Sequence, residues 1–555
     1  MKRFLPLALL AASLAGCDLF TGPDDKISVP SVGKLLTFNV NHESTCDSPV
    51  FRTGRVAAVT QHAIVVADTA NPANGFTDAD YQGFGEAFDN LVWPVDTGTF
   101  GEPTDIDHNG RVVIFFTRYV NDLTPQGAGF FYGGFTFSRD LFPQKGTKEL
   151  GECTASNEAE MFYMLVPDPA RGGPFSLSEV RRTTVGTLAH EFQHLINAAR
   201  RLYVLKAGDN WEEVVWLNEG LSHVAEELTF YRASGLTPKQ DIDVAKIVAA
   251  PGGSAAELSY QRSNFTRLQS FYGEPEANSP YDTDDDLATR GAIWQFLRYE
   301  GDRRPDDQAF FNGLANSKVR GMENLQAAMG SDPIPAFRDW AVSIYTDNAV
   351  QTSDSRFAQP SWNFRSVLAA IRGGTFFLKT RQLAGGATRL TLHAGGTAFL
   401  RFGVAAGARA DITLSTGSGA ACQTVALQVG QVFTANPGEG THLCVDGGTG
   451  GGEYTLVPFY GARTSDDQLP LTVTSTGVQI AAGPPSPDRV PFASAAPALQ
   501  TTPTFRQSTQ LEMQLRDRER RELTPLIRDR GTASHAQAAA TAAPSDLYVS
   551  VVRTK

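Results

Sequence analysis

Positive charge and cysteine are both scarce in this chain of 555 residues, and a long apolar run occurs only at its start. The 48 Lys and Arg residues are outnumbered by 60 Asp and Glu residues, so the formal net charge is -12. We expect no basic surface that could neutralise phosphates, which argues against nucleic acid as a partner. Beyond the N-terminal segment no apolar run reaches the length of a bilayer, so we expect no transmembrane helix in the mature chain.

The first residues are typical of an export signal. Lys2 and Arg3 precede the apolar run FLPLALLAASLAG, which is too short to span a bilayer and ends in small residues. The stretch Leu14-Ala15-Gly16-Cys17 resembles a bacterial lipobox, in which the mature chain begins at a lipidated cysteine. We therefore expect a signal peptide at residues 1–16 and an exported, membrane-anchored lipoprotein, periplasmic or at the cell surface, held by its lipid at Cys17. The alternative is an ordinary secretory signal with a cysteine nearby.

Four cysteines remain without Cys17, and they are Cys46, Cys153, Cys422 and Cys444. Export places them in an oxidising compartment, so we expect two disulfides. Four cysteines allow three pairings, but the large gap in the sequence favours Cys46 with Cys153 and Cys422 with Cys444. Neither pair has the spacing of a metal site.

The composition and the hydrophobic pattern of the chain change several times along its length. Residues 17–48 are expected to be a spacer. Residues 49–352 begin with strand-like runs such as RVAAVT, HAIVVAD, RVVIFF and EMFYMLVPD, and helical patterns follow from Ser176, the order of an α+β domain. Residues 365–475 alternate over short segments between Gly-rich turns, which predicts an all-β sandwich. Composition predicts a low-complexity, mobile tail over residues 476–555, with a charged segment able to form one helix.

One helix carries two histidines on the same face. Ser176 and Glu179 form a capping box, and an apolar residue then recurs with helical period through TLAHEFQHLINAARR. His190 and His194 lie one turn apart, so both imidazoles can reach one Zn²⁺, and Glu191 lies beside them as a general base. The alternative is a helix that carries two histidines by accident.

A catalytic zinc ion needs a third protein ligand and an open fourth position. The segment WLNEGLSHVAEEL has an apolar stripe that predicts a second helix, and Glu219, 25 residues after His194, is the natural third ligand. Two alternatives stay open. Glu219 is a solvated carboxylate, or another residue of this region binds instead, namely His223, Glu212, Glu213 or Glu226.

The motifs HEFQH and WLNEG together resemble the gluzincin metallopeptidases, and HEFQHLINAARR with NEGLSHVAEE is most similar to the hyicolysin-type group. The resemblance covers roughly residues 50 to 350 and implies a zincin-type, thermolysin-like α+β domain. It also implies one zinc ion held by His190, His194 and Glu219, with Glu191 as the base. Thermolysin-like relatives have a carboxylate four residues after the ligand glutamate to orient a zinc histidine, whereas this chain has His223 there.

Two roles are open for His223: it accepts a hydrogen bond from a ligand histidine, or it faces the substrate and stabilises the oxyanion. The alternative is a helix histidine satisfied by its neighbours. Other candidates for the oxyanion donor are Tyr260, Tyr281 and Arg290. The aromatic strand EMFYMLVPD is expected at the edge of the sheet, where it could align an extended substrate by main-chain pairing.

A calcium site is a weaker expectation. Asp105, Asp107 and Asn109 are spaced like the start of a calcium-binding loop, but Phe116 replaces the closing glutamate. A tight Asn-Gly turn before the next strand is the interpretation we favour.

These features together predict an extracytoplasmic zinc metallopeptidase that hydrolyses peptide bonds in proteins or peptides. Endopeptidase activity is favoured, because no motif in the expected position would anchor a free amino terminus. Two other functions stay open. One is a lipid-anchored binding or adhesion protein on an inactive zincin scaffold, and the other is a zinc amidase that acts on cell-wall peptide.

Overall fold

The computed structural model describes residues 29–128, 130–415, 421–435, 441–481, 506–507, 510–528 and 546–555. The signal segment and Cys17 lie outside these residues. No helix within the described ranges combines the length and the apolar content that a membrane span requires.

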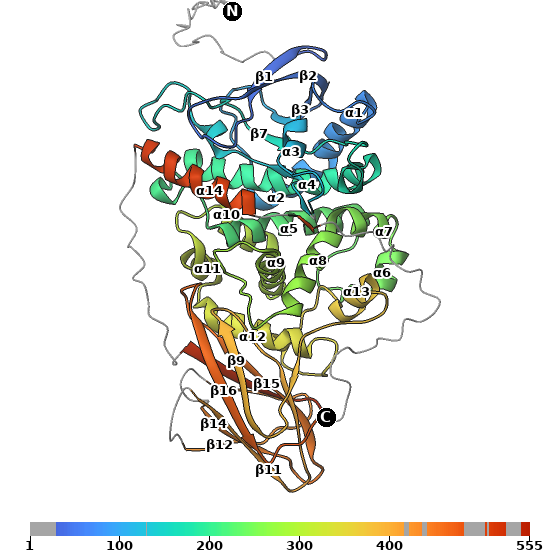
Figure 1. The fold of residues 1–555 in the computed structure, drawn as a ribbon, viewed down its shortest axis with the longest axis vertical. Coiled ribbons are helices and arrows are strands. Elements are labelled where there is room, and N and C mark those ends of the chain that lie inside the picture. The colour runs from blue at the N-terminus through green and yellow to red at the C-terminus, as the bar shows by residue number, and fades with distance from the viewer. Residues whose placement is uncertain are drawn as a thin grey trace, which may run out of the picture.

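A mixed sheet of six strands forms the N-terminal layer, in the order β1-β2-β3-β4-β7-β6 (Figure 1). Its strands are β1 (Leu35–Asn39), β2 (Phe51–Val59), β3 (Ala63–Asp68), β4 (Val112–Phe116), β6 (Gly134–Phe135) and β7 (Met161–Met164). Strands β3, β4 and β7 run parallel, and every residue in them is buried. The near-continuous apolar runs follow from this, because a strand covered on both faces has no polar side. Strands β2, β3, β4 and β7 confirm the four runs predicted from the sequence.

Helices fill the space below the sheet and make up most of the middle of the molecule (Figure 1). The first five in chain order are α1 (Asp78–Ala87), α2 (Trp93–Phe100), α3 (Arg118–Asp122), α4 (Leu177–Ala199) and α5 (Val215–Ser234). The later ones are α6 (Val244–Ala249), α7 (Gly253–Ala256), α8 (Arg262–Gly273), α9 (Leu287–Gly301), α10 (Asp307–Ala315), α11 (Gly321–Met329), α12 (Pro333–Thr346) and α13 (Phe364–Ile371).

Helix α5 packs between α4 and α9. Gly220 makes the close approach to α9 possible, since a Cβ at this position would lie 2.8 Å from Ile293 and 2.9 Å from Leu297. The side of α5 that faces α4 therefore stays fixed relative to the rest of the helical core.

Two five-stranded sheets form the far end of the molecule (Figure 1). The first has the order β13-β18-β15-β10-β8 and the second β12-β14-β11-β16-β9. Their strands are β8 (Arg381–Gln382), β9 (Gly386–His393), β10 (Leu400–Val404), β11 (Arg409–Leu414), β12 (Gln423–Val425), β13 (Val432–Ala435), β14 (His442–Asp446), β15 (Gly452–Tyr460), β16 (Gln468–Thr476) and β18 (Leu547–Arg553). Side chains along β16 alternate between buried and solvent-facing positions, the pattern of a sandwich strand.

In its described parts the expected mobile tail is wrong, except that a helix forms in the charged segment as expected. Strand β18 lies inside the first sheet, hydrogen-bonded to β13 and β15, and is almost entirely buried. Strand β17 (Arg506–Gln507) pairs with β5 (Phe130–Phe131), and helix α14 (Gln510–Leu523) follows it. The two strands could not be expected from composition, because they are short and lie next to Pro- and Ala-rich sequence.

The expected domain limits also shift at both ends. Part of the expected spacer forms β1, which pairs with β2 along the sheet edge. The helical core extends past residue 352, because the ring of Trp362 is fully buried against Phe230 and Phe265, and α13 follows it. The first residues of the expected sandwich, from 365 to 371, therefore belong to a helix of the preceding core.

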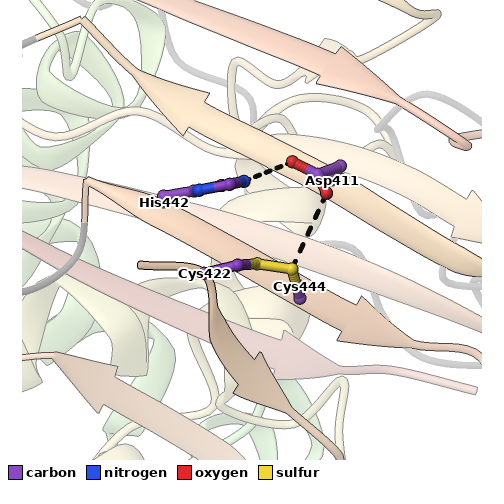
Figure 2. Close-up of side chains that lie close together, drawn as sticks. All are labelled: Asp411, Cys422, His442 and Cys444. Atoms are coloured by element: carbon purple, nitrogen blue, oxygen red, sulfur yellow. Dashed lines mark hydrogen bonds and ion pairs between the residues drawn. A yellow bond between two sulfur atoms is a disulfide. The ribbon is translucent and has the colours of Figure 1, made fainter. Parts of the chain in front are cut away.

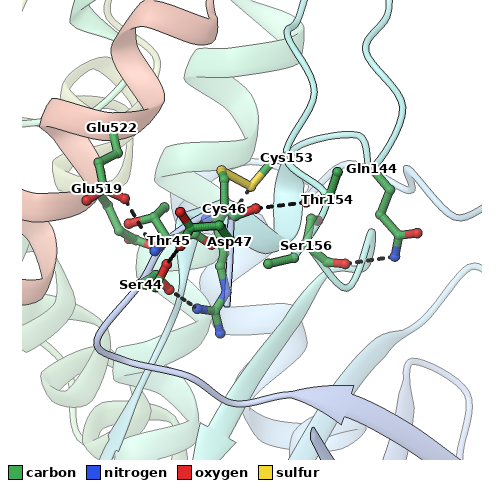
Figure 3. Close-up of a disulfide and its surroundings, with 12 residues drawn as sticks. Ser44, Thr45, Cys46, Asp47, Gln144, Cys153, Thr154, Ser156, Glu519 and Glu522 are labelled. Atoms are coloured by element: carbon green, nitrogen blue, oxygen red, sulfur yellow. Dashed lines mark hydrogen bonds between the residues drawn. A yellow bond between two sulfur atoms is a disulfide. The ribbon is translucent and has the colours of Figure 1, made fainter. Parts of the chain in front are cut away.

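Both expected disulfides are present. Cys46 is joined to Cys153, and Cys422 to Cys444. The first ties the loop after β1 to the loop before β7 (Figure 3), and the second joins the segment before β12 to β14 (Figure 2).

Candidate metal centre

The two motif histidines meet on the buried face of α4. Ser176 caps this helix by accepting a hydrogen bond from the backbone N–H of Glu179 at 3.4 Å. Helical periodicity then brings the imidazoles of His190 and His194 together, with 3.1 Å between their Nε2 atoms. Both side chains are buried, so the pair faces the interior of the site.

Glu219 completes the group from α5. Its Oε2 lies 3.3 Å from His190 Nε2, and its Oε1 lies 3.4 Å from His194 Nε2. Tetrahedral zinc bound at its usual distances keeps its ligand atoms about 3.3 Å apart, so these separations fit one zinc ion. Glu219 is fully buried and therefore is not the solvated carboxylate of the first alternative. Glu213 belongs to a different contact, an ion pair with Arg201.

The electrostatics of the group favour a bound cation. Burial favours the neutral form of Glu219, but Arg290 and the histidines outweigh it and hold its pKa well below the usual range. Burial lowers the pKa of His194 to about 3, so this ring is neutral and can donate a lone pair. Burial lowers the pKa of His190 too, yet hydrogen bonds to Glu219 and Glu226 outweigh burial and raise it to about 10. A metal ion would replace the proton that these carboxylates hold on His190.

A carboxylate orients one of the two rings. Glu226 Oε1 lies 3.0 Å from His190 Nδ1, whereas Ser222 Oγ lies 3.0 Å from His194 Nδ1 and 3.2 Å from His194 Nε2, beside both nitrogens of that ring. Such a carboxylate contact fixes the ring and raises the basicity of its other nitrogen. The orienting carboxylate is therefore Glu226, seven residues after Glu219, rather than a residue at the thermolysin-like position, where His223 stands.

His223 lies beside His190, with 4.8 Å between the ring centroids, and shares Glu226 with it. Its Nδ1 lies 3.2 Å from Glu226 Oε1, and its Nε2 lies 4.0 Å from Glu219 Oε2. His190, Glu219 and His223 each offer a ligand atom within 4.8 Å of the others, so His223 is also placed to face a metal ion. Its Nε2 is buried and has no hydrogen-bond partner among the described residues. Burial lowers the pKa of His223 to about 3, so this ring is neutral.

Glu191 projects from α4 toward the edge of the sheet. The hydroxyl of Thr136 donates to Glu191 Oε2 at 3.0 Å. Gly134 makes room for the carboxylate, since a Cβ there would lie 3.3 Å from Glu191 Cγ and 3.0 Å from Thr187. Burial raises the pKa of Glu191 to about 7, which suits a group that must take up and release a proton near neutral pH.

Of the proposed oxyanion donors, Arg290 lies closest to Glu219. Its Nη1 is 2.9 Å from Glu219 Oε2, and it lines a small cavity together with His190 and Glu191. Two bonds to Asp285, at 2.9 and 2.7 Å, fix the guanidinium. Tyr281 instead donates to the carbonyl of Ala462, at the sandwich.

The other two candidates have weaker positions. Tyr260 packs against α4 at Gly186, one turn before the first histidine. His223 is not among the described residues that line the cavity.

The expected edge strand is wrong. Strand β7, which contains EMFYM, lies between β4 and β6, so its main-chain groups are already used. The strand at the edge is β6, which runs antiparallel to β7 directly before Thr136. The aromatic residues of β7 are buried core residues and do not mark a binding edge.

The residues of the expected calcium site form part of a carboxylate group. Asp105, Asp107 and Glu160 each offer an oxygen within 4.8 Å of the others. Asp105 Oδ1 accepts from the N–H of Gly110 at 2.9 Å, and Asp107 accepts from Asn109. These bonds build the turn itself.

A second group of donor atoms lies in the sandwich, where Asp411 stands between His442 and Cys444 (Figure 2). Its two sulfur atoms, from Cys422 and Cys444, are joined in a disulfide and offer no thiolate to a metal.

No protein-family model matches this sequence. Over 155 residues, 28% of the chain, it is 33% identical to the neutral metalloprotease ShpI of Staphylococcus hyicus. That relative is named for its metal-dependent proteolysis. The matched stretch covers 32% of its length, about a third, so the likeness supports a distant relationship to metallopeptidases.

Sequence reasoning missed several roles in the site. Glu226 was named only as an alternative ligand, and its orienting role could have been found, because it lies two helical turns after Glu219 and therefore on the same face of α5. Thr136 and the role of Gly134 carried no local signal, since they reach Glu191 only through the pairing of β6 with β7. Arg290 was one of four candidates, and only the packing of α9 against α5 distinguishes it.

Proposed function

We propose that this protein is a zinc metallopeptidase of the gluzincin type with a zincin-like catalytic fold, followed by a β-sandwich. The observation that carries the proposal is the convergence of His190, His194 and Glu219 at zinc-ligand separations, with Glu191 beside them. The metalloprotease relative supports the same reaction class.

The chemistry divides between the metal and the chain. Bound zinc would polarise the scissile carbonyl and lower the pKa of the attacking water. The His190–Glu226 contact holds the imidazole of His190 in the orientation that the metal requires, and Ser222 lies against the ring of His194.

Glu191 is the proton carrier of the proposed reaction. Its carboxylate takes a proton from the attacking water and later delivers it to the departing amine nitrogen. The hydroxyl of Thr136 holds Oε2 and so directs the carboxylate during both transfers.

Arg290 is the donor that we assign to the developing negative charge on the carbonyl oxygen. Its guanidinium is fixed by Asp285 and lies on the cavity side of Glu219. A preorganised donor of this kind typically contributes about 10²- to 10³-fold in kcat.

The substrate that we propose is an extended peptide, aligned by the free edge of the sheet near β6, and endopeptidase activity is favoured. The lipobox at Cys17 supports an exported, lipid-anchored location.

Zinc content tests the proposal directly. We would measure bound zinc by elemental analysis in the full chain and in the variants Glu219→Ala and Glu191→Ala, and then cleavage of a peptide library. About one zinc per chain, lost with Glu219 but retained without Glu191, is expected. A folded, zinc-supplemented protein that binds no zinc would contradict the proposal and favour an anchored binding protein. Zinc binding with cleavage of cell-wall peptides alone would favour the amidase.

A further inference from the structure

A segment from the far C-terminal part of the chain lies on the candidate active site. Strand β16 ends at Thr476 and β18 begins at Leu547, both in the sandwich, yet the residues between them include β17 and α14, which lie on the catalytic domain. Figure 1 shows α14 alongside α4, at the opposite end from the strands that flank it in sequence. The segment thus leaves the sandwich, crosses the site and returns.

Strand β17, which precedes α14, pairs with the main chain of β5, close to the edge strand β6. Residues Arg506 and Gln507 run parallel to Phe130 and Phe131, three residues before β6. Peptidases and other peptide-binding proteins commonly align extended ligands by adding a strand in this way.

Two charged side chains of α14 bind residues of the metal centre itself. Glu512 Oε2 lies 2.6 Å from Arg290 Nη2, the group that we assign to the oxyanion. One turn later, Arg516 Nη2 lies 3.4 Å from Glu219 Oε1. The helix thus places a carboxylate where negative charge would develop and a cation beside a metal ligand.

Apolar contacts hold the same helix in place. Leu515 is 6% exposed and belongs to the cluster formed by Phe131, Phe135 and Phe137. Leu523, at the end of the helix, is fully buried in the main core. Burial of the two leucines stabilises the seated helix and offsets part of the entropy lost on ordering it.

The end of α14 is fixed by the N-terminal loops. Glu519 accepts hydrogen bonds from the backbone N–H groups of Ser138 and Arg139 at 3.1 and 3.2 Å. Glu522 accepts from the N–H of Thr45, beside the Cys46–Cys153 disulfide (Figure 3).

The seated helix leaves almost no room at the catalytic residues. The cavity lined by His190, Glu191, Arg290 and Glu512 has a volume of about 20 Å³, enough for about one water molecule. His190 is 6% exposed and Glu191 2% exposed. A peptide could reach them only after α14 has moved.

We propose that the catalytic cleft is a binding surface for a segment of the same chain, described at residues 506–507 and 510–528, which fills it as a tethered inhibitor. The proposal rests on the proposed peptidase function. Peptide substrates and this segment compete for one surface, so activity depends on the fraction of molecules in which α14 is released.

Two neighbouring residues of α14 provide a matched test in the full, zinc-loaded chain. Leu515→Asp places a charge in the buried contact, whereas Gln514→Asp places the same charge on the exposed face. We would measure cleavage of an internally quenched peptide, binding of a dansyl-labelled peptide hydroxamate, and hydrogen exchange of the α14 amides. Arg516→Glu, which sets a carboxylate against Glu219, provides a second release variant should Leu515→Asp fold poorly.

Release should raise kcat/KM and hydroxamate affinity by about 10-fold or more, because the competent fraction increases. Gln514→Asp should stay within about twofold of the parent. Faster α14 exchange without any gain in cleavage or hydroxamate binding would overturn the proposal. Slow exchange of α14 in the parent is also required, and rapid exchange there would overturn it too. Absence of zinc in every variant would contradict the proposed peptidase function instead, and the exchange data would still show whether the segment is seated.

Discussion

Glu226 provides the sharpest test of how the metal centre is built, because it contacts the histidines but is not one of the three residues that we propose as metal ligands. Its Oε1 lies 3.0 Å from His190 Nδ1 and 3.2 Å from His223 Nδ1, and its Oε2 accepts from Arg267 at 3.2 Å. The variant Glu226→Gln keeps the shape of the side chain and removes its charge. We expect it to weaken zinc binding and leave the fold intact.

The size of the effect follows from the contact to His190. Loss of a carboxylate behind a ligand histidine typically lowers metal affinity by about 10- to 100-fold. This corresponds to about 1.4 to 2.8 kcal/mol in the free energy of zinc binding. The variant also removes the buried carboxylate partner of Arg267, and breaking a buried ion pair lowers the free energy of unfolding by about 3 to 5 kcal/mol.

A second variant separates these two effects. Glu226→Gln combined with Arg267→Gln removes both charges, so it should recover much of the free energy of unfolding but none of the zinc affinity. Zinc affinity would be measured by competition with a fluorescent chelator, and stability by urea unfolding of the metal-free protein. Unchanged zinc affinity in folded Glu226→Gln would refute the orienting role. Recovery of zinc affinity in the double variant would refute it as well and assign the loss to the buried arginine.

Three further outcomes are expected. Glu191→Gln should keep its zinc and lose about 10²- to 10⁴-fold in kcat, measured by peptide cleavage at saturating substrate; a smaller loss would argue against a general base at this position. Replacing both Cys46 and Cys153 by Ser should lower the free energy of unfolding by about 2 to 5 kcal/mol, because the disulfide closes a loop with a sequence separation of 107, and an unchanged urea midpoint would contradict this. Seating of α14 should weaken as pH rises from about 4.5 to 7. Burial and the nearby Glu212 raise the pKa of Glu519 to about 7 despite Arg139, so the seated form holds a proton that the released form gives up. Hydrogen exchange of α14 against pH checks this, and a Glu519→Gln protein should show a weaker dependence, since Glu212 and Glu191 also face α14.

Much of the fold follows from local pattern. The runs in β3 and β4 are apolar throughout because parallel strands are covered on both faces. Helix α4 can be predicted from its N-terminal capping residue and from the helical period of its apolar residues. Whether a strand lies inside the sheet or at its edge does not follow from local pattern. Nothing within EMFYM distinguishes an internal strand from an edge strand, since that depends on whether a two-residue strand elsewhere, β6, pairs with it.

The metal centre divides in the same way. The histidine pair and Glu191 are set by spacing within one helix, and Glu219 by its place in a second helix with a clear apolar stripe. The groups that orient and complete them reach the site through tertiary packing. Thr136 follows the edge strand β6 and Arg290 lies on α9. The sequence around each of them does not distinguish it from an ordinary surface residue.

The segment around α14 shows why composition misleads when a helix is built to bind charge. QLEMQLRDRERREL has low hydropathy and reads as a solvated helix, yet Glu512, Arg516, Glu519 and Leu523 recur at positions 0, 4, 7 and 11 on one face, and all four face the catalytic domain. A buried charged face of a helix is stable only where it contacts charges of the opposite sign. The candidate metal centre supplies them in Arg290 and Glu219, so the polarity that made the segment look like a free tail is what fits it to this site.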